Sequence, residues 1–107
     1  MPKCMLNVTY NAEGMKGLIK EGGTGRRATV ADMIGALGGR LESFHYSAGG
    51  TTVYAVADVP DTTTVAAVTM AIRASGMMDI ETTMLLTPEE IDQAAKKSVN
   101  YRSPGKS

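Results

Sequence analysis

The order of the hydrophobic patterns constrains this chain most. Segments that alternate apolar and polar residues, and segments with apolar residues three or four positions apart, follow one another as strand, helix, strand, strand, helix, strand within the first 90 residues. A βαββαβ order of this size predicts an α+β domain, with one open, four-stranded antiparallel sheet and its helices on one face. The other face of such a sheet must be covered, so we expect a partner.

Four strands are predicted, over residues 3–10, 40–48, 51–59 and 79–86. Each has an apolar face, formed in turn by Cys4, Leu6, Val8 and Tyr10, by Phe44, Tyr46 and Ala48, by Val53, Ala55, Ala57 and Val59, and by Ile80, Thr82, Met84 and Leu86. Strict alternation in the second strand places Leu41, Ser43, His45 and Ser47 on its opposite face. Gly49-Gly50 predicts a two-residue hairpin turn between the second and third strands.

Helices are predicted over residues 12–20, 26–37, 62–75 and 88–98. Three glycines between Gly22 and Gly25 predict a loop that separates the first two, and Gly38 and Gly76 predict helix ends. Thr87 followed by Pro88 is typical of a helix start. We therefore expect a single domain over residues 1–98 and a flexible polar tail over 99–107.

The balance of charges excludes some classes of partner. The chain has 11 basic and 11 acidic residues, so its formal net charge is zero. General nucleic-acid binding and attachment to a membrane surface both favour a basic excess, and we expect neither partner. The single cysteine, Cys4, cannot form an internal disulfide, and the sequence has no signal-peptide or membrane-spanning pattern. We expect a cytoplasmic protein.

His45 is the only histidine and the candidate catalytic residue. If it faces a cleft between sheet and helices, its imidazole is suited to general acid–base catalysis near neutral pH. The alternatives are a histidine that bonds to a neighbouring hydroxyl or lies in a dimer interface. One histidine and one cysteine do not complete a zinc site, so we expect neither a metal nor a cofactor. Haem held by His45 alone is the alternative.

A second candidate site follows Gly22–Gly25. A glycine-rich turn before a helix presents free N–H groups, and Arg26 and Arg27 add positive charge, which suits a phosphate or carboxylate. Lys16 would add to an anion pocket if its side chain faced inward. The alternative is a flexible loop with solvated arginines. Three tyrosines on different strands, Tyr10, Tyr46 and Tyr54, are candidates for orienting a ligand, or are half-buried sheet residues.

Four stretches of the chain resemble the GYD-domain family of small bacterial proteins. They are Tyr10-Asn11 before Glu13-Gly14-Met15-Lys16, then Leu37-Gly38-Gly39-Arg40-Leu41, then Val59-Pro60-Asp61, and finally Ile80-Glu81-Thr82-Thr83 followed by Leu86-Thr87-Pro88-Glu89-Glu90. The resemblance covers roughly residues 3–95. The resemblance implies a ferredoxin-like domain that pairs as a dimeric α+β barrel. The family signature reads glycine, any residue, tyrosine, aspartate. This chain has Gly49-Gly50-Thr51-Thr52 in its place, so no role of the signature tyrosine and aspartate is carried over.

Two functions follow as hypotheses. The first is a homodimeric or larger barrel that binds a small organic anion through Lys16, Arg26 or Arg27, and in which His45 moves a proton for a cofactor-free isomerisation or oxygenation. The second is a non-catalytic assembly or sensory module whose sheet face serves only oligomerisation. The sequence leaves open whether the protein is an enzyme.

Overall fold

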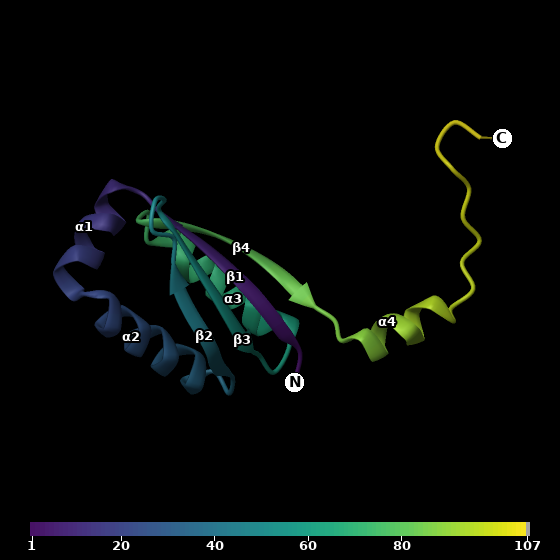
Figure 1. Cartoon of the computed structure of the whole chain (residues 1–107), viewed down its shortest axis with the longest axis horizontal. Helices are drawn as coiled ribbons and strands as arrows, with labels where there is room; N and C mark the ends of the chain where they lie inside the picture. Colours follow the sequence, from purple (N-terminus) through teal and green to yellow (C-terminus); the bar gives the residue numbers. More distant parts are fainter. Residues whose placement is uncertain (107) are drawn as a thin grey trace.

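A computed structural model describes residues 1–106 and confirms the ferredoxin-like α+β fold (Figure 1). The four strands are β1 (Lys3–Tyr10), β2 (Arg40–Tyr46), β3 (Thr52–Asp58) and β4 (Met78–Leu85). They form one sheet in the order β2-β3-β1-β4, and every neighbouring pair is antiparallel. The strands β2 and β4 are the two edges of this sheet.

The helices are α1 (Ala12–Glu21), α2 (Gly23–Ala36), α3 (Thr62–Ala74) and α4 (Pro88–Ala95). The prediction of a loop at Gly22–Gly25 was wrong, because only Gly22, with φ 85°, interrupts the helices. Gly23 and Gly25 belong to the first turn of α2, where the Tyr46 and Thr29 hydroxyls donate hydrogen bonds to their carbonyls (2.9 and 3.1 Å). These tertiary and local bonds offset the low helix propensity of glycine, about 1 kcal/mol for each residue.

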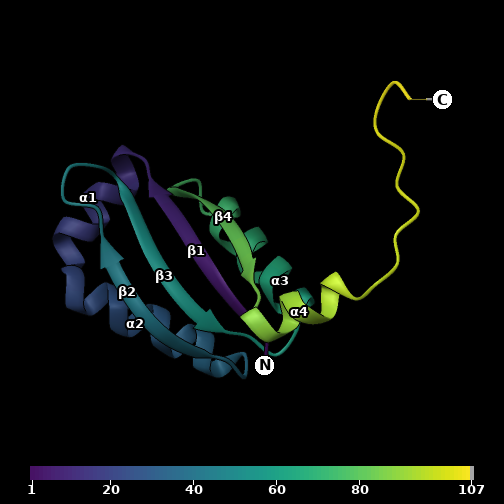
Figure 2. The same cartoon turned by 45° about the vertical axis from the view of Figure 1, so that its right-hand side comes forward.

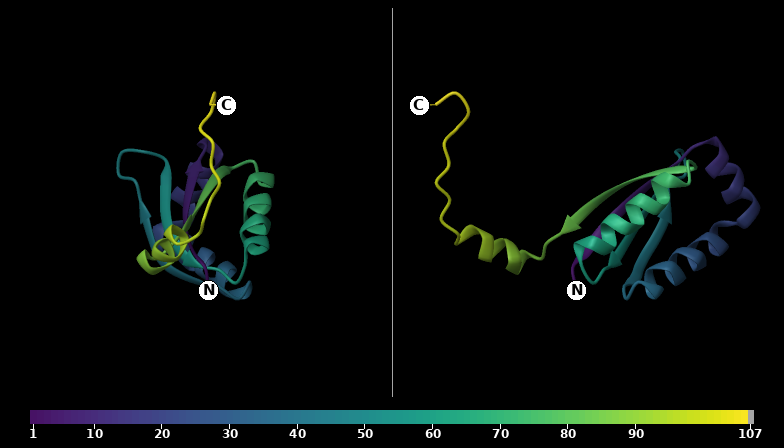
Figure 3. Two further views of the ribbon diagram at one scale, coloured as in Figure 1. Left: turned by 90° about the vertical axis from the view of Figure 1, so that its right-hand side faces the viewer. Right: turned by 180° about the vertical axis from the view of Figure 1, so that it is seen from behind.

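The predicted apolar faces of β1 and β3 form one side of the core. The buried residues of the core are Cys4, Leu6, Tyr10, Ile34, Val53, Ala55, Ala57, Val59, Val68 and Ile80. Side chains of α1, α2 and α3 pack against this cluster, and α3 lies in front of the strands when the molecule is seen from behind (Figure 3). We call this side of the sheet the covered face.

A β-bulge between Leu41 and Ser43 changes which residues of β2 face the helices. Leu41 pairs with Ala57 and packs against the core, whereas Ser43 pairs with Val56, on the other side of the sheet. The expectation that Leu41 shares a face with Ser43 and His45 was therefore wrong, because the bulge inserts one extra residue, Glu42, and shifts the alternation.

The β2–β3 connection is also longer than predicted. It runs from residue 47 to 51, and the two-residue turn at Gly49-Gly50 is not formed. The tight hairpin turns that Gly-Gly favours need at least one positive φ, and among residues 1–106 only Gly22, Gly38, Gly76 and Gly105 have one. Gly38 and Gly76 do end α2 and α3, as the sequence predicts.

Asn11 joins the start of α1 to the residues that precede β4. Its side-chain oxygen accepts a hydrogen bond from the Gly14 backbone (3.0 Å), and its own backbone N–H donates to the Met77 carbonyl (3.0 Å). Gly14 is buried against that carbonyl, and a Cβ added at this position would overlap it. This close approach fixes α1 against the start of β4.

The sheet side away from the helices, which we call the open face, is formed by the residues that alternate with the core. Among them are Met5, Asn7, Tyr54, Val56, Glu81, Thr83 and Leu85. Helix α4 covers neither face, and extends with the residues that follow it away from the sheet (Figures 1 and 2). The radius of gyration is 17.1 Å, whereas a compact domain of this length has about 13 Å.

The predicted domain 1–98 thus ends in a helix that stands apart from the sheet. Of the predicted tail, residues 99–106 are described and contain no helix or strand, and Ser107 lies outside the described residues. None of the helices in residues 1–106 combines the length and apolar character needed to span a membrane.

Candidate functional site

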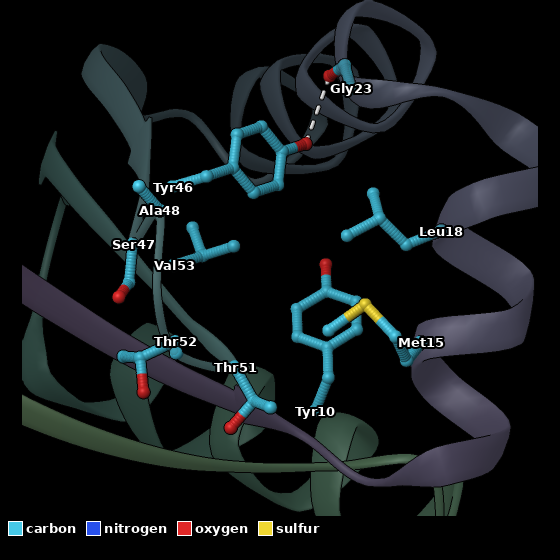
Figure 4. Close-up of a pocket in the computed structure, with 11 residues that line it drawn as sticks. Tyr10, Met15, Leu18, Gly23, Tyr46, Ser47, Ala48, Thr51, Thr52 and Val53 are labelled. Carbon is cyan, nitrogen blue, oxygen red and sulfur yellow. Dashed lines mark hydrogen bonds between the residues drawn. The ribbon is translucent and has the colours of Figure 1, made fainter.

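A cavity of about 340 Å³ lies between the α1–α2 junction and the β2–β3 connection (Figure 4). The end of β1 and the start of β3 form its floor. Its lining is aromatic, aliphatic and hydroxyl-bearing, and consists of Tyr10, Met15, Leu18, Gly23, Tyr46, Ser47, Ala48, Gly50, Thr51, Thr52 and Val53. No charged side chain among residues 1–106 lines it.

Two tyrosines define the polar groups inside the cavity. Tyr46, the last residue of β2, donates a hydrogen bond from its hydroxyl to the Gly23 carbonyl (2.9 Å) and thereby joins β2 to the start of α2. Tyr10, the last residue of β1, is 6% exposed. In Figure 4 its hydroxyl points into the cavity beside Leu18 and Met15, and no hydrogen bond joins it to another residue drawn there. The Tyr10 hydroxyl is therefore available to a bound molecule.

The electrostatic surroundings keep the Tyr46 hydroxyl protonated. Burial raises its pKa, and the nearby Tyr10 adds to the rise, while Arg26 and Arg27 act against it. A phenol with a raised pKa is a hydrogen-bond donor at neutral pH and a poor base. The cavity can therefore orient a molecule by hydrogen bonds between its apolar walls.

The three candidate cations lie outside this cavity. Lys16 is exposed on α1, and its Nζ lies 3.5 Å from Glu13 Oε1. The Arg26 Nη1 atom lies 3.8 Å from Glu21 Oε1, while its Nε is buried without an acceptor in the described part of the chain. The structure therefore does not bring Lys16, Arg26 and Arg27 together around an enclosed site.

His45 and Tyr54 lie on the open face, where they oppose each other on β2 and β3. His45 is exposed and shares a shallow groove of about 420 Å³ with Arg27, between α2 and the edge strand β2. Of the seven candidate residues, the structure thus places Tyr10 and Tyr46 at the cavity, His45 and Arg27 at the groove, and Tyr54 on the open face.

Sequence reasoning missed most of the cavity wall. Met15 and Leu18 come from a short helix whose inward side depends on the Gly22 kink, and Ser47, Thr51 and Thr52 come from a connection longer than predicted. Of the lining residues beyond the two tyrosines, Ala48 and Val53 carried a signal, as members of the predicted apolar faces of the second and third strands. Within residues 1–106, no three His, Cys, Asp or Glu side chains are grouped so that they could hold a metal ion.

Comparison with known proteins supports a family but no individual relative. Neither the curated proteins nor the solved structures include a significant match to this chain. One family model, described as the GYD domain, matches residues 4–95, which include all of the sheet except Lys3, the helices that cover it, and α4. The chain belongs to the GYD domain family.

Proposed function

We propose that this protein binds a small, neutral, largely apolar molecule in the cavity between α1 and the β2–β3 connection. The observation that carries the proposal is the lining itself: two tyrosine hydroxyls, three smaller hydroxyl side chains and apolar walls, without a charged group. Ligand sites commonly combine a mostly apolar wall with a few placed polar groups in this way.

The lining favours a neutral molecule over the anion expected from the sequence. An ionised carboxylate placed in a partly buried site loses hydration, and that loss must be offset by a nearby cation. Lys16 and Arg26 instead face acidic neighbours, Glu13 and Glu21, and Arg27 lies at the groove on the edge of β2. A neutral molecule needs no such partner.

The volume and the polar groups narrow the ligand class further. A cavity of about 340 Å³ is at the small end of ligand sites, which suits one or two fused rings. Met15, Leu18 and Val53 would contact the faces of such rings. The Tyr10 hydroxyl would bond to a hydroxyl or carbonyl group of the ligand, and Tyr46 would remain bonded to Gly23. We propose binding as the activity, since the lining offers no ordinary base for isomerisation.

A matched pair of probes tests the ligand class. We would record saturation-transfer NMR of the full chain with 2-naphthol, which is neutral at pH 7, and with 2-naphthoate, which has the same rings and a negative charge. We expect saturation transfer to 2-naphthol and at least about tenfold weaker binding of 2-naphthoate, a difference of about 1.4 kcal/mol. Equal or stronger binding of 2-naphthoate would contradict a neutral site.

Two substitutions locate the binding. Tyr10→Phe keeps the ring and removes the hydroxyl, so we expect about two- to tenfold weaker binding of 2-naphthol, the value of one hydrogen bond. Ala48→Trp should fill the cavity mouth and abolish binding, and Ala66→Trp, on the exposed side of α3, is its control. Thermal unfolding confirms that each variant is folded. Binding that survives Ala48→Trp would refute this cavity as the site.

A second candidate function is homo-oligomeric assembly through the open face. The supporting observation is that Met5, Val56 and Leu85 are only partly buried on a face that no helix of residues 1–106 covers. Light scattering with size-exclusion chromatography should give the mass of a dimer, and Val56→Glu should convert it to a monomer. A wild-type monomer at about 100 μM would contradict assembly, since sheet-face dimers of standard size bind more tightly than this.

A further inference from the structure

The chain after β4 forms an arm that leaves the sheet with its apolar side chains unpacked. We define the arm as residues 86–106, which contain α4 (Figures 1 and 3). Leu86, Ile91, Val99 and Tyr101 are 60%, 53%, 76% and 72% exposed. Yet α4 begins with a complete capping box, in which the Thr87 hydroxyl accepts from Glu90 N–H and the Glu90 carboxylate accepts from Thr87 N–H. The helix start is thus specified locally, although nothing in residues 1–106 covers the helix.

Charge divides the arm into two halves. The helix α4 carries Glu89, Glu90 and Asp92 and no basic residue, whereas residues 96–106 carry Lys96, Lys97, Arg102 and Lys106 and no acidic residue. A basic segment of this kind binds a surface that offers carboxylates and other hydrogen-bond acceptors.

The open face offers such a surface at one end. A hollow of about 360 Å³ is lined by Asn7, Thr9, Thr52, Tyr54, Asp79, Ile80 and Glu81, and we call it the acidic hollow. Asp79 is paired with Arg73, whose Nε lies 2.8 Å from Asp79 Oδ1. Glu81 has no ion-pair partner among residues 1–106, and the buried Oδ1 atom of Asn7 has no hydrogen-bond donor there. Both acceptors therefore lack a partner in the described part of this chain.

We propose that a second copy of this chain covers the open face and that the two copies exchange arms, so that the basic half of each arm binds the acidic hollow of the other copy. The occupant is chosen by charge, because the arm provides the basic groups that the exposed Glu81 lacks. A two-fold pair would satisfy both hollows at once.

The direction of the arm favours the hollow of another copy over its own. The acidic hollow lies at the start of β4, beside Asp79. The arm begins at the other end of β4, after Leu85, about 20 Å away along the strand. The helix α4, which begins at the Thr87 capping box, extends away from the sheet (Figure 1). If a two-fold axis perpendicular to the strands relates the two copies, the strands of one copy run opposite to those of the other. The end of β4 in one copy, where its arm begins, then lies beside the acidic hollow of the other copy.

The arm is long enough for this exchange. Residues 97–106 can span up to about 33 Å when extended, and a strand of eight residues, such as β4, is about 26 Å long. The basic half can thus follow the length of a partner strand. Leu86 and Ile91, near the root, would be covered as the two copies meet.

Isotope-resolved cross-linking tests the exchange directly. Full-length protein labelled with ¹⁵N is mixed with unlabelled protein, allowed to re-equilibrate, and treated with a carbodiimide that joins lysine amines to carboxylates in contact. We expect peptides that join Lys96, Lys97 or Lys106 to Glu81 or Asp79, with half of them pairing a labelled and an unlabelled chain. Links found only within one isotope, or no link at this hollow, would overturn the exchange.

A charge swap separates this proposal from the open-face dimer on which it rests. Glu81→Lys should raise the dimer dissociation constant about tenfold, and adding Lys96→Glu and Lys97→Glu to the same chain should restore it. Asp32→Lys, on α2, is the control and should have no effect. A wild-type dimer that Glu81→Lys leaves unchanged would refute the arm exchange and keep the dimer, whereas a wild-type monomer would refute both.

Discussion

The two faces of the sheet are made by the same strands and have opposite characters. In β3, Val53, Ala55 and Ala57 are 2%, 1% and 0% exposed, whereas Tyr54, between the first two, is 46% exposed. The covered face is mainly apolar, with Thr82 as a polar exception, because its cover, α1 to α3, is part of the same chain. The open face mixes Met5 and Val56 with Asn7, His45 and Glu81, a composition closer to the interface between two proteins than to a core. The difference shows that one face is completed within the chain, whereas no helix of residues 1–106 covers the other.

The largest expected effect is a difference in stability between two variants of β4. One variant truncates a core side chain, and the other truncates a side chain on the open face of the same strand. Ile80, 2% exposed, faces the helices, and Leu85 lies on the open face. We expect Ile80→Ala to lower the free energy of unfolding by about 2–5 kcal/mol, because it leaves a cavity. Leu85→Ala should cost under about 1 kcal/mol in urea unfolding at low protein concentration. Equal losses would show that the faces do not differ in burial.

Two glycines of α1 sharpen the comparison at the edge of the covered face. A Cβ at Gly14 would overlap the Met77 carbonyl, whereas a Cβ at Gly17 would meet nothing within 4 Å. We expect Gly14→Ala to destabilise the protein by about 1–3 kcal/mol, through displacement of α1. Gly17→Ala should stabilise it by about 0.5–1 kcal/mol, because alanine favours the helix. Thermal unfolding of both variants decides this, and a stabilising Gly14→Ala would contradict the close contact.

The smallest effect is a pH dependence at the open-face end of β1 and β3. Lys3 Nζ lies 2.6 Å from Glu42 Oε2 and 3.0 Å from Asp58 Oδ1. The Lys3 hydrogen bond, aided by Arg40, lowers the pKa of Asp58 below its ordinary 3.8. Because the folded-state pKa is the lower one, this contribution to stability is present above pH 3.8 and is lost as the pH falls through the folded-state value.

The matched variants for this effect are Asp58→Asn and Asp32→Asn. Asp58→Asn should flatten the decline of stability below pH 4 only slightly, because its partners Lys3 and Arg40 remain 39% and 70% exposed to solvent. Asp32 forms no ion pair with residues 1–106, and its replacement should leave the pH profile unchanged. Urea unfolding between pH 2.5 and 6 measures both, and an identical profile for wild type and Asp58→Asn would show that Lys3 and Asp58 contribute nothing.

Most of the fold was predictable because each strand and helix carries a local signal. Alternation identified the covered faces of β1 and β3, Gly38 and Gly76 ended their helices, and the Thr87-Pro88 start of α4 was readable from capping alone. The errors came from tertiary contacts. Hydrogen bonds to the Gly23 and Gly25 carbonyls hold a helix start where composition predicts a loop, and the bulge in β2 depends on pairing with β3.

The candidate site was less predictable, because it depends on which residues of separate elements face one another. Tyr10 and Tyr46 are the last residues of β1 and β2, which lie on either side of β3, and the structure brings both to one cavity. His45 alternates with Phe44 and Tyr46 along β2. Because the side chains of Phe44 and Tyr46 lie on the face that the helices cover, the side chain of His45 lies on the open face. The sides taken by Lys16 and Arg26 depend on the angle between α1 and α2 at Gly22, which no local pattern specifies.

The bulge in β2 also gives this chain a position where its length can change. Glu42 is the extra residue, and deleting it would leave Leu41 facing Ala57 and Ser43 facing Val56 in an uninterrupted alternation. Every other side chain of the strand would keep its face, and only the contact from Lys3 to Glu42 would be lost. In an ordinary strand, a one-residue deletion moves the side chains beyond it to the opposite face. Here the same deletion would remove the bulge and leave a regular strand. Relatives of different length in this segment can therefore share the same core and the same cavity.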